Sequence, residues 1–167
     1  MSEGLLAGFQ GHEHWMRQAL RLAEQAEAMG EVPVGAVVVR DGQIIGRGHN
    51  QVEQLKDATA HAEILAIGAA SDHTGEWRLE GATLYVTLEP CTMCCGALLL
   101  SRVPTLVFGA HDPRAGGVIS TARLLQGNPY HHPVEVVGGI MGDVCRDQLS
   151  TFFRRRRQTG GESTPEC

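Results

Sequence analysis

Two short segments of this chain carry residues whose types and spacing could hold a metal ion and move protons. One is H-A-E at residues 61–63, and the other is P-C-T-M-C at residues 90–94. An imidazole and two thiolates form a ligand set that Zn²⁺ accepts in tetrahedral geometry, and three protein ligands leave the fourth position to water. The glutamate of the first segment can stay off the metal. The sequence therefore predicts a zinc site with His61, Cys91 and Cys94 as ligands.

The competing interpretation is that the two segments are unrelated. An H-x-E triplet is common on helices, and a C-x-x-C pair can be a redox pair or two buried thiols. The proline before Cys91 and the apolar run after Cys94 favour the metal site instead. A structural zinc usually has four protein ligands. Cys95, Cys145 and the remaining histidines are the candidates for a fourth, and Cys95 is too close to Cys94 in sequence to share its metal easily, so we expect an open, catalytic position.

Glu63 is the candidate for proton transfer. Zinc at this site would lower the pKa of a bound water toward ~7. Glu63 could then take a proton from the water, protonate a ring nitrogen and finally protonate leaving ammonia. The alternative is a first-turn carboxylate that stabilises the helix N-terminus. Beside three metal ligands, the shuttle is the favoured interpretation.

Other polar residues give weaker signals. Asn50 follows a predicted strand and could hold a base or a ribose, although asparagine after a strand is more often a turn residue. Asp112 precedes a proline and is also typical of a turn. Glu89 is expected to be a loop carboxylate, either salt-bridged or in solvent. Taken alone, none of the three indicates a site.

Composition indicates one soluble globular domain. The chain has 167 residues, of which 43% are hydrophobic and 20% charged. No apolar run approaches the roughly twenty residues needed to span a bilayer, and residues 1–10 lack the basic and apolar regions of a signal peptide. Five cysteines, two of them in the C-x-x-C pair, indicate no disulfide framework. We therefore expect a cytoplasmic protein with no membrane or disulfide partner.

The charge distribution leaves two interpretations open. The net charge of −5 argues against nucleic acid as a partner, but Arg154–Arg157 are four consecutive arginines. They could be a solvated helix end whose cations complement the helix dipole, or a patch that contacts phosphates. On the residues alone the solvated helix is favoured, because charge runs are often solvated faces.

Apolar spacing predicts the elements that must position these residues. Helices are expected over 12–29, 60–70, 91–100 and 142–158, a short one over 122–125, and strands over 34–39, 44–48, 83–88, 105–109 and 134–137. Gly30 is a candidate helix C-cap, Thr59 a candidate N-cap, and Asp41-Gly42 a hairpin turn. Strands that alternate with helices indicate an α/β layered sheet.

This order places the ligands in the first turns of two helices. The positive dipole ends of both helices would then face one metal, which favours thiolate and hydroxide. Cys95 is expected to pack in the core. Residues 1–11 are interpreted as an N-terminal extension, residues 12–158 as the zinc-dependent domain, and residues 159–167 as a disordered tail.

Beyond the metal signature, which is that of zinc-dependent nucleobase deaminases, the chain resembles the bacterial tRNA-specific adenosine deaminases (the TadA family) of the cytidine/deoxycytidylate deaminase superfamily. The resemblance covers about residues 12–158. It is carried by the following segments: 31–39 (EVPVGAVVV), 48–50 (GHN), 59–64 (TAHAEI), 82–94 (ATLYVTLEPCTMC), 107–112 (VFGAHD) and 152–157 (FFRRRR).

The resemblance implies a three-layer α/β/α fold of the cytidine-deaminase type, with a central five-stranded mixed sheet, and a homodimer. It implies hydrolytic deamination of adenosine to inosine at the wobble position of a tRNA anticodon, with one Zn²⁺ per subunit. The family's functional positions match the following residues: zinc ligands His61, Cys91 and Cys94; proton shuttle Glu63; substrate contacts Asn50, Ala62 and Asp112; contacts to the anticodon stem-loop Arg154, Arg156 and Arg157.

The chain departs from the family pattern at three places. Ile119 interrupts an expected Gly-Ser pair, Pro133 stands where a basic residue is usual, and Ala58 replaces a proline. Two other functions stay open. A zinc-dependent deaminase of free bases or nucleosides, such as guanine or cytosine, would need the same ligands without the arginines. A zinc-stabilised RNA-binding module without catalysis is the third, and the presence of Glu63 argues against it.

Overall fold

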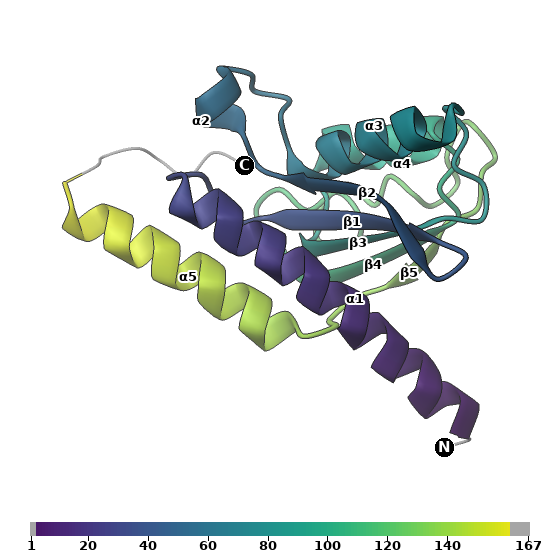
Figure 1. Ribbon diagram of the computed structural model, residues 1–167, viewed down its shortest axis with the longest axis horizontal. Helices are drawn as coiled ribbons and strands as arrows, with labels where there is room; N and C mark the ends of the chain where they lie inside the picture. The colour runs from purple at the N-terminus through teal and green to yellow at the C-terminus, as the bar shows by residue number, and fades with distance from the viewer. Residues whose placement is uncertain (1–2, 161–167) are drawn as a thin grey trace.

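The computed structural model describes residues 3–160, and side chains from residue 11 onward. It is a mixed five-stranded sheet between two layers of helices (Figure 1). The elements, in chain order, are α1 (Glu3–Ala28), β1 (Gly35–Arg40), β2 (Gln43–His49), α2 (Val52–Leu55), α3 (Ala62–Thr74), β3 (Thr83–Leu88), α4 (Thr92–Leu100), β4 (Thr105–Ala110), β5 (Glu135–Val137) and α5 (Gly142–Gln158). The predicted α/β layered sheet is confirmed.

The sheet has the strand order β2-β1-β3-β4-β5. β1 pairs antiparallel with both β2 and β3, whereas β3, β4 and β5 are parallel. The β1–β2 hairpin turns at Asp41-Gly42, where both residues have positive φ angles of 52° and 69°. This is the backbone that a type I′ turn requires, and it explains the D-G pair.

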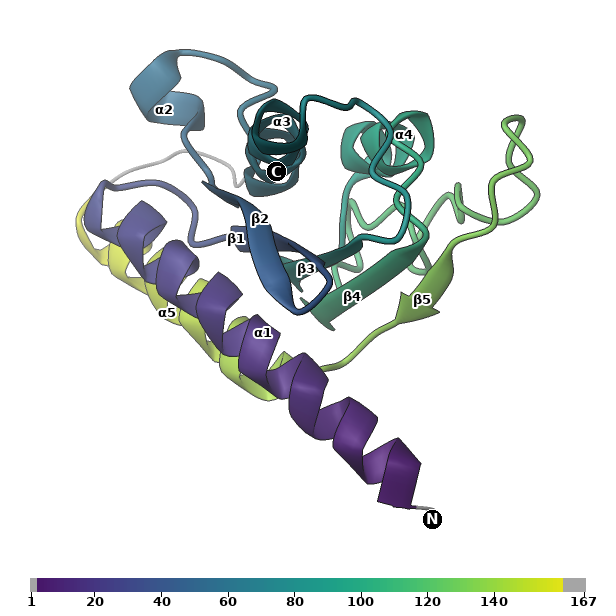
Figure 2. The same cartoon turned by 45° about the vertical axis from the view of Figure 1, so that its right-hand side comes forward.

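Alternation along β1 divides the core between the two faces of the sheet. Ala36 and Val38 pack into the cluster under α3 and α4, while Val37 and Val39 pack into the cluster under α1. Figures 1 and 2 show α1 and α5 side by side on one face and α3 and α4 together on the other. Among the described residues, no helix is both long enough and apolar enough to cross a bilayer.

Two glycines bring α3 into direct contact with β2. A Cβ atom on Gly48 would lie 2.3 Å from the carbonyl oxygen of Ala62, and one on Gly46 would lie 2.3 Å from that of Ala66. A side chain at either position would push the helix away from the sheet. Because Ala62 follows His61 directly, this contact also fixes the start of α3 and the histidine before it.

The structure differs from the sequence-based expectation at several element ends. Thr59 is not the N-cap of α3, because its amide and hydroxyl donate to the Asp57 carboxylate instead; His61 takes the N-cap position. The apolar pattern does not predict the short α2 helix. The helix expected over 122–125 does not form: Arg123 has a positive φ of 47°, and residues 124–127 form a turn. The first helix was expected to begin at residue 12, after an N-terminal extension. Instead α1 begins at Glu3 and continues without a break across residues 11 and 12. Of the predicted tail, Thr159 and Gly160 form a turn and residues 161–167 lie outside the described residues.

We expect Gly46→Ala to lower the free energy of unfolding by about 1–3 kcal/mol, since the added methyl group clashes with α3. The matched control is Gly68→Ala within α3, where a Cβ meets nothing within 4 Å and removal of a helical glycine stabilises by about 0.5–1 kcal/mol. Chemical denaturation of both variants measures the difference. Equal stabilities would contradict the close approach of α3 to β2.

Candidate metal centre and substrate cleft

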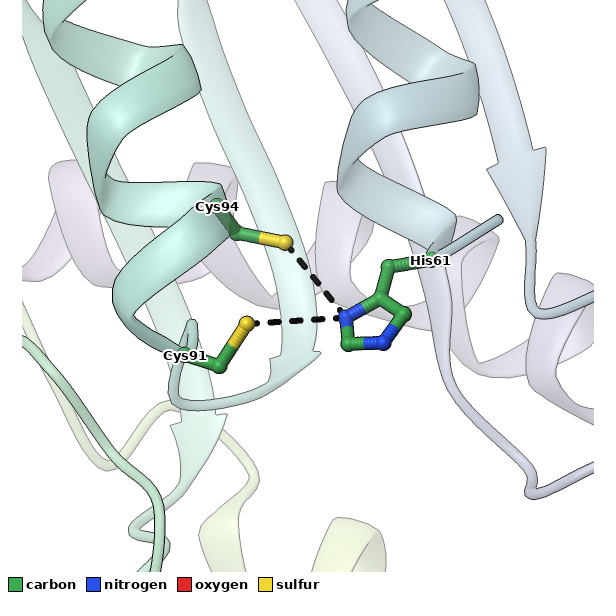
Figure 3. Close-up of side chains that lie close together, drawn as sticks. All are labelled: His61, Cys91 and Cys94. Atoms are coloured by element: carbon green, nitrogen blue, oxygen red, sulfur yellow. Dashed lines mark hydrogen bonds between the residues drawn. The ribbon is translucent and has the colours of Figure 1, made fainter. Parts of the chain in front are cut away.

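The three predicted ligands meet at the N-termini of two helices. His61 is the N-cap of α3 and Cys91 is the N-cap of α4, both with extended backbone, and Cys94 lies in the first turn of α4. Figure 3 shows the two cysteine side chains turned toward the imidazole of His61. The ligands thus come from the N-terminal ends of two helices, as expected. His61 and Cys91, however, each precede the first residue of their helix.

The distances fit one zinc ion. The sulfur atoms of Cys91 and Cys94 each lie 3.6 Å from Nδ1 of His61, and the three ligand atoms lie within 4.8 Å of one another. Tetrahedral bonds of ~2.3 Å to sulfur and ~2.0 Å to nitrogen require a sulfur–nitrogen separation of about 3.6 Å. The trio therefore has the spacing of a zinc site, with Nδ1 as the histidine's ligand atom.

The trio is complete within the described part of the chain, so a fourth position is left for water or substrate. No further histidine, cysteine, aspartate or glutamate there belongs to the group. Cys95 is buried and its sulfur lies 3.7 Å from the carbonyl oxygen of Pro90, away from the trio. Cys145 lies in the core cluster on the opposite face of the sheet. All four described cysteines are free thiols rather than disulfides.

The two ligand thiols are electrostatically coupled. A hydrogen bond from Cys94, and a second from His61, lower the pKa of Cys91 to about 4 despite burial. Donating that hydrogen bond to Cys91, together with burial, raises the pKa of Cys94. The pair thus loses one proton readily, and a cation is needed to remove the second. Zinc binding supplies that cation and releases the proton.

Glu63 lies in the first turn of α3, only 4% exposed. It does not belong to the ligand trio of the described residues. Burial raises its pKa to about 7, partly opposed by a hydrogen bond from its own backbone amide and by the nearby His61. A carboxyl group of this kind can take up and release a proton near neutral pH. Glu63 therefore contacts the helix N-terminus and also has the properties of a proton shuttle.

Asn50 joins the end of β2 to the start of α3. It is 5% exposed, and its Oδ1 accepts a hydrogen bond of 2.9 Å from the backbone amide of Ala62. Its acceptor is thereby committed to the helix, which orients the Nδ2 donors. Asn50 is therefore more than a turn residue, and Asn50 and Ala62 form one unit beside His61.

Two buried glutamates hold the loops around this centre, and neither was identified from the sequence. Glu31 accepts the backbone amides of Glu53 and Gln54 at the start of α2. Glu89 was expected in solvent or in a salt bridge. It is not in solvent but buried; its Oε1 lies 3.4 Å from Nδ1 of His111, and its carboxylate mainly accepts the backbone amides of residues 112, 118, 119 and 120. These bonds lower its pKa although burial opposes them. Because the donors lie far away in sequence, no local pattern marks either residue.

A cavity of about 620 Å³ runs from the loop after β4 to α5. Asp112, Phe153 and Arg157 are among its lining residues. The carboxylate of Asp112 accepts the amides of residues 114 and 115, which confirms the predicted turn. Of the other arginines, Arg155 lies 3.4 Å from Glu27 of α1, and Arg156 stacks 5.6 Å over the ring of Phe152. Arg154 is exposed.

Comparison with known families places these residues in context. Residues 10–110 match the family model described as the cytidine and deoxycytidylate deaminase zinc-binding region. The tRNA-specific adenosine deaminase of Bacillus subtilis strain 168 is 51% identical over 146 residues, which covers 87% of this chain and 91% of that protein. Its counterpart from Haemophilus influenzae is 48% identical over 147 residues, covering 87% and 85%.

Solved structures agree with the sequence comparison. A structure from a study of A-to-I editing by tRNA:A34 deaminases at the wobble position superposes with a TM-score of 0.79 and 44% identity, covering 81% of this chain and 99% of that one. A guanine deaminase from Nitrosomonas europaea has the same fold, with a TM-score of 0.70 and 25% identity, covering 84% and 83%. The expected five-stranded mixed sheet of the cytidine-deaminase type is thus confirmed.

We expect purified protein to contain about one zinc ion per chain, as a set of three ligands implies. Cys94→Ser should lose most of this zinc because it removes a ligand. Cys95→Ala, next to it in sequence but outside the trio, should retain it. Metal analysis after dialysis measures both. Zinc retained in Cys94→Ser, or lost in Cys95→Ala, would show that the ligand set is wrong.

Proposed function

The chain belongs to the cytidine and deoxycytidylate deaminase family, and we propose that it converts adenosine to inosine at the wobble position of a tRNA anticodon. The observation that carries this proposal is the open three-ligand centre with the buried Glu63 beside it. Relatives named tRNA-specific adenosine deaminase match over 87% of the chain, and the structure from the study of tRNA:A34 deaminases covers 81% of it.

The reaction consumes one water and releases one ammonia at C6 of adenine. A zinc ion held by His61, Cys91 and Cys94 would supply the Lewis acidity that makes water nucleophilic near neutral pH. Glu63 accepts a first proton from the attacking water and passes it to a ring nitrogen; it then accepts the remaining proton from the new hydroxyl group on C6 and passes it to the amino group, which leaves as ammonia. Burial raises the pKa of Glu63 to about 7, so its carboxyl group can accept and release protons repeatedly near neutral pH.

Substrate recognition is assigned to the residues that border the centre. Asn50, whose Oδ1 is held by the amide of Ala62, is assigned to contact the target nucleotide together with Ala62. Asp112, which lines the cavity between the loop after β4 and α5, is assigned to the target ribose. These three residues hold the nucleoside while Glu63 moves protons.

A polynucleotide substrate is supported by the cavity beside Asp112. Unpaired loop bases are recognised by stacking on aromatic rings and by contacts to phosphates, and Phe153 and Arg157 line this cavity. A deaminase of free bases has no use for these groups. Arg154 and Arg156 extend the positive surface of α5 and are assigned to the same anticodon stem-loop.

We also propose a homodimer. Leu100 is 54% exposed at the end of α4, and Ile119 and Leu124 are exposed on the loop whose Gly117 amide donates to Pro90, just before this helix. A second copy could cover these apolar side chains. Residues 12–158 are proposed as the deaminase domain, and we infer a cytoplasmic location from the proposed tRNA substrate.

The proposed function is tested by incubating the zinc-loaded protein with total tRNA and analysing the nucleosides released by digestion. Inosine should accumulate at the expense of adenosine. Free adenine, guanine and cytosine serve as parallel substrates. Deamination of a free base without inosine in tRNA would replace this proposal with the free-base deaminase.

Glu63→Gln should lower the rate of inosine formation by at least ~10²–10⁴-fold, because general acid–base catalysis contributes about that much. The zinc content should stay unchanged, since Glu63 is not a ligand. Glu80→Gln, at an exposed carboxylate, is the control variant. Single-turnover kinetics report the chemical step. A Glu63→Gln rate within a few-fold of the unmodified protein would remove Glu63 from the mechanism.

Arg157→Ala should weaken binding of an anticodon stem-loop and reduce the slope of log affinity against log salt by roughly one unit, as expected for one lost phosphate contact. Arg155→Ala removes the same charge, but from an arginine already paired with Glu27, so its slope should change less. Fluorescence anisotropy across a salt series compares the two. Identical slopes for both variants and the parent would assign these arginines to a solvated helix end.

Light scattering at micromolar concentration should return twice the mass of one chain. Leu100→Glu should shift it toward one chain, because a charge would be buried in the proposed interface. Met29→Glu introduces the same charge at an exposed position on the other face of the molecule and should remain dimeric. A single-chain mass for the unmodified protein would contradict the homodimer.

A further inference from the structure

Glu89 is a buried carboxylate that the proposed chemistry does not use. It lies between the end of β3 and the Pro90-Cys91 pair, and its side chain has no exposed surface. One loop surrounds it. The groups that donate to it are the backbone amides of Asp112, Val118, Ile119 and Ser120 and the hydroxyl of Ser120. The half-exposed ring of His111 also lies 3.4 Å from Oε1.

The same loop is anchored against the metal-binding turn. The amide of Gly117 donates to the carbonyl oxygen of Pro90 at 2.8 Å, directly before Cys91. A Cβ on Gly116 would lie 2.2 Å from Oε2 of Glu89. Glycine at 116 is therefore required for the carboxylate to enter the loop. Ile119 contributes its backbone amide to this contact, so a side chain that departs from the family pattern leaves the contact intact.

We propose that Glu89 is a positioning residue that fixes Asp112 relative to the metal centre. Its backbone is two residues from Cys91, and its side chain holds both the beginning and the end of the loop 112–120. The position of Asp112 is thereby tied to the position of the metal ligand Cys91. This inference rests on the proposed function for its effect on substrate, but the restraint of the loop stands on the hydrogen bonds alone.

A carboxylate is needed here because every neighbouring group is a donor. An ionised carboxylate accepts through both oxygens and donates nothing. Oε2 accepts three successive amides, and Oε1 accepts one amide and a hydroxyl. Glu89→Gln is nearly isosteric, but it replaces one acceptor oxygen with an NH₂ group, which is a donor. Some of the loop donors would then face another donor and lose their acceptor. The loop should then loosen while the ligands stay in place.

The experiment compares zinc-loaded Glu89→Gln with the unmodified protein. Hydrogen exchange of the 112–120 segment should become faster, and zinc content should be unchanged. With an anticodon stem-loop as substrate, kcat/KM should fall about 10- to 100-fold, the range seen when residues that orient a site are changed, mainly through a higher KM. If Glu89 acts through Asp112, Glu89→Gln should cost little more in an Asp112→Ala background.

Val103→Ala, buried beyond the other end of α4, controls for a general loss of stability and should change neither loop exchange nor KM. If Glu89→Gln does not fold, Ser120→Ala removes one donor at an exposed position and should show the same pattern more weakly. The proposal is overturned if hydrogen exchange of the 112–120 segment is unchanged in Glu89→Gln. It is also overturned if the losses of kcat/KM in Glu89→Gln and Asp112→Ala multiply in the double variant, as they would for independent residues. Absence of inosine with the unmodified protein instead overturns the proposed function, and the exchange measurement still decides the role of Glu89.

Discussion

The approach of two cysteine sulfurs to one imidazole nitrogen is the constraint on which the rest of the structure depends. The 3.6 Å separations require the N-termini of α3 and α4 to meet at one point. Glycines in β2 let α3 lie directly on the sheet, and the parallel pairing of β3 with β4 fixes the segments on either side of α4. Helix dipoles add a favourable field for the thiolates. The sheet and the two helices together hold the three ligand atoms at these distances.

Three buried glutamates show how environment assigns different roles to one residue type. Glu31 accepts two backbone amides and Glu89 accepts four, and each serves as a fixed anchor for a loop. The hydrogen bonds to Glu89 outweigh its burial and lower its pKa. At Glu63 burial prevails over the hydrogen bonds and the nearby His61, and it raises the pKa to about 7. Hydrogen bonds to the charged form and desolvation act in opposite directions. The balance between them separates the structural carboxylates from the chemical one.

Sequence patterns were sufficient wherever the signal was local. The D-G hairpin and the buried strands follow from spacing and composition within a few residues. His61 and Cys91 of the ligand trio are 30 positions apart, but the H-A-E and P-C-T-M-C segments each mark their own part of it by residue type. The N-cap predicted for α3 was wrong because Thr59 donates its amide and hydroxyl to Asp57. The helix predicted over 122–125 was wrong because Arg123 adopts a positive φ of 47°, which a right-handed helix excludes. Glu89 could not be found in this way, since its donors follow it by 23 to 31 positions. Only the folded chain brings them together.

The central claim is that the metal has two cysteine ligands, one histidine ligand and one position open to exchange. X-ray absorption at the zinc edge of the purified protein tests it most directly. We expect two sulfur neighbours at about 2.3 Å and two lighter neighbours at about 2.0–2.1 Å, with outer-shell scattering from a single imidazole. A third sulfur neighbour, or scattering from two imidazoles, would mean a closed protein site and would contradict the catalytic role.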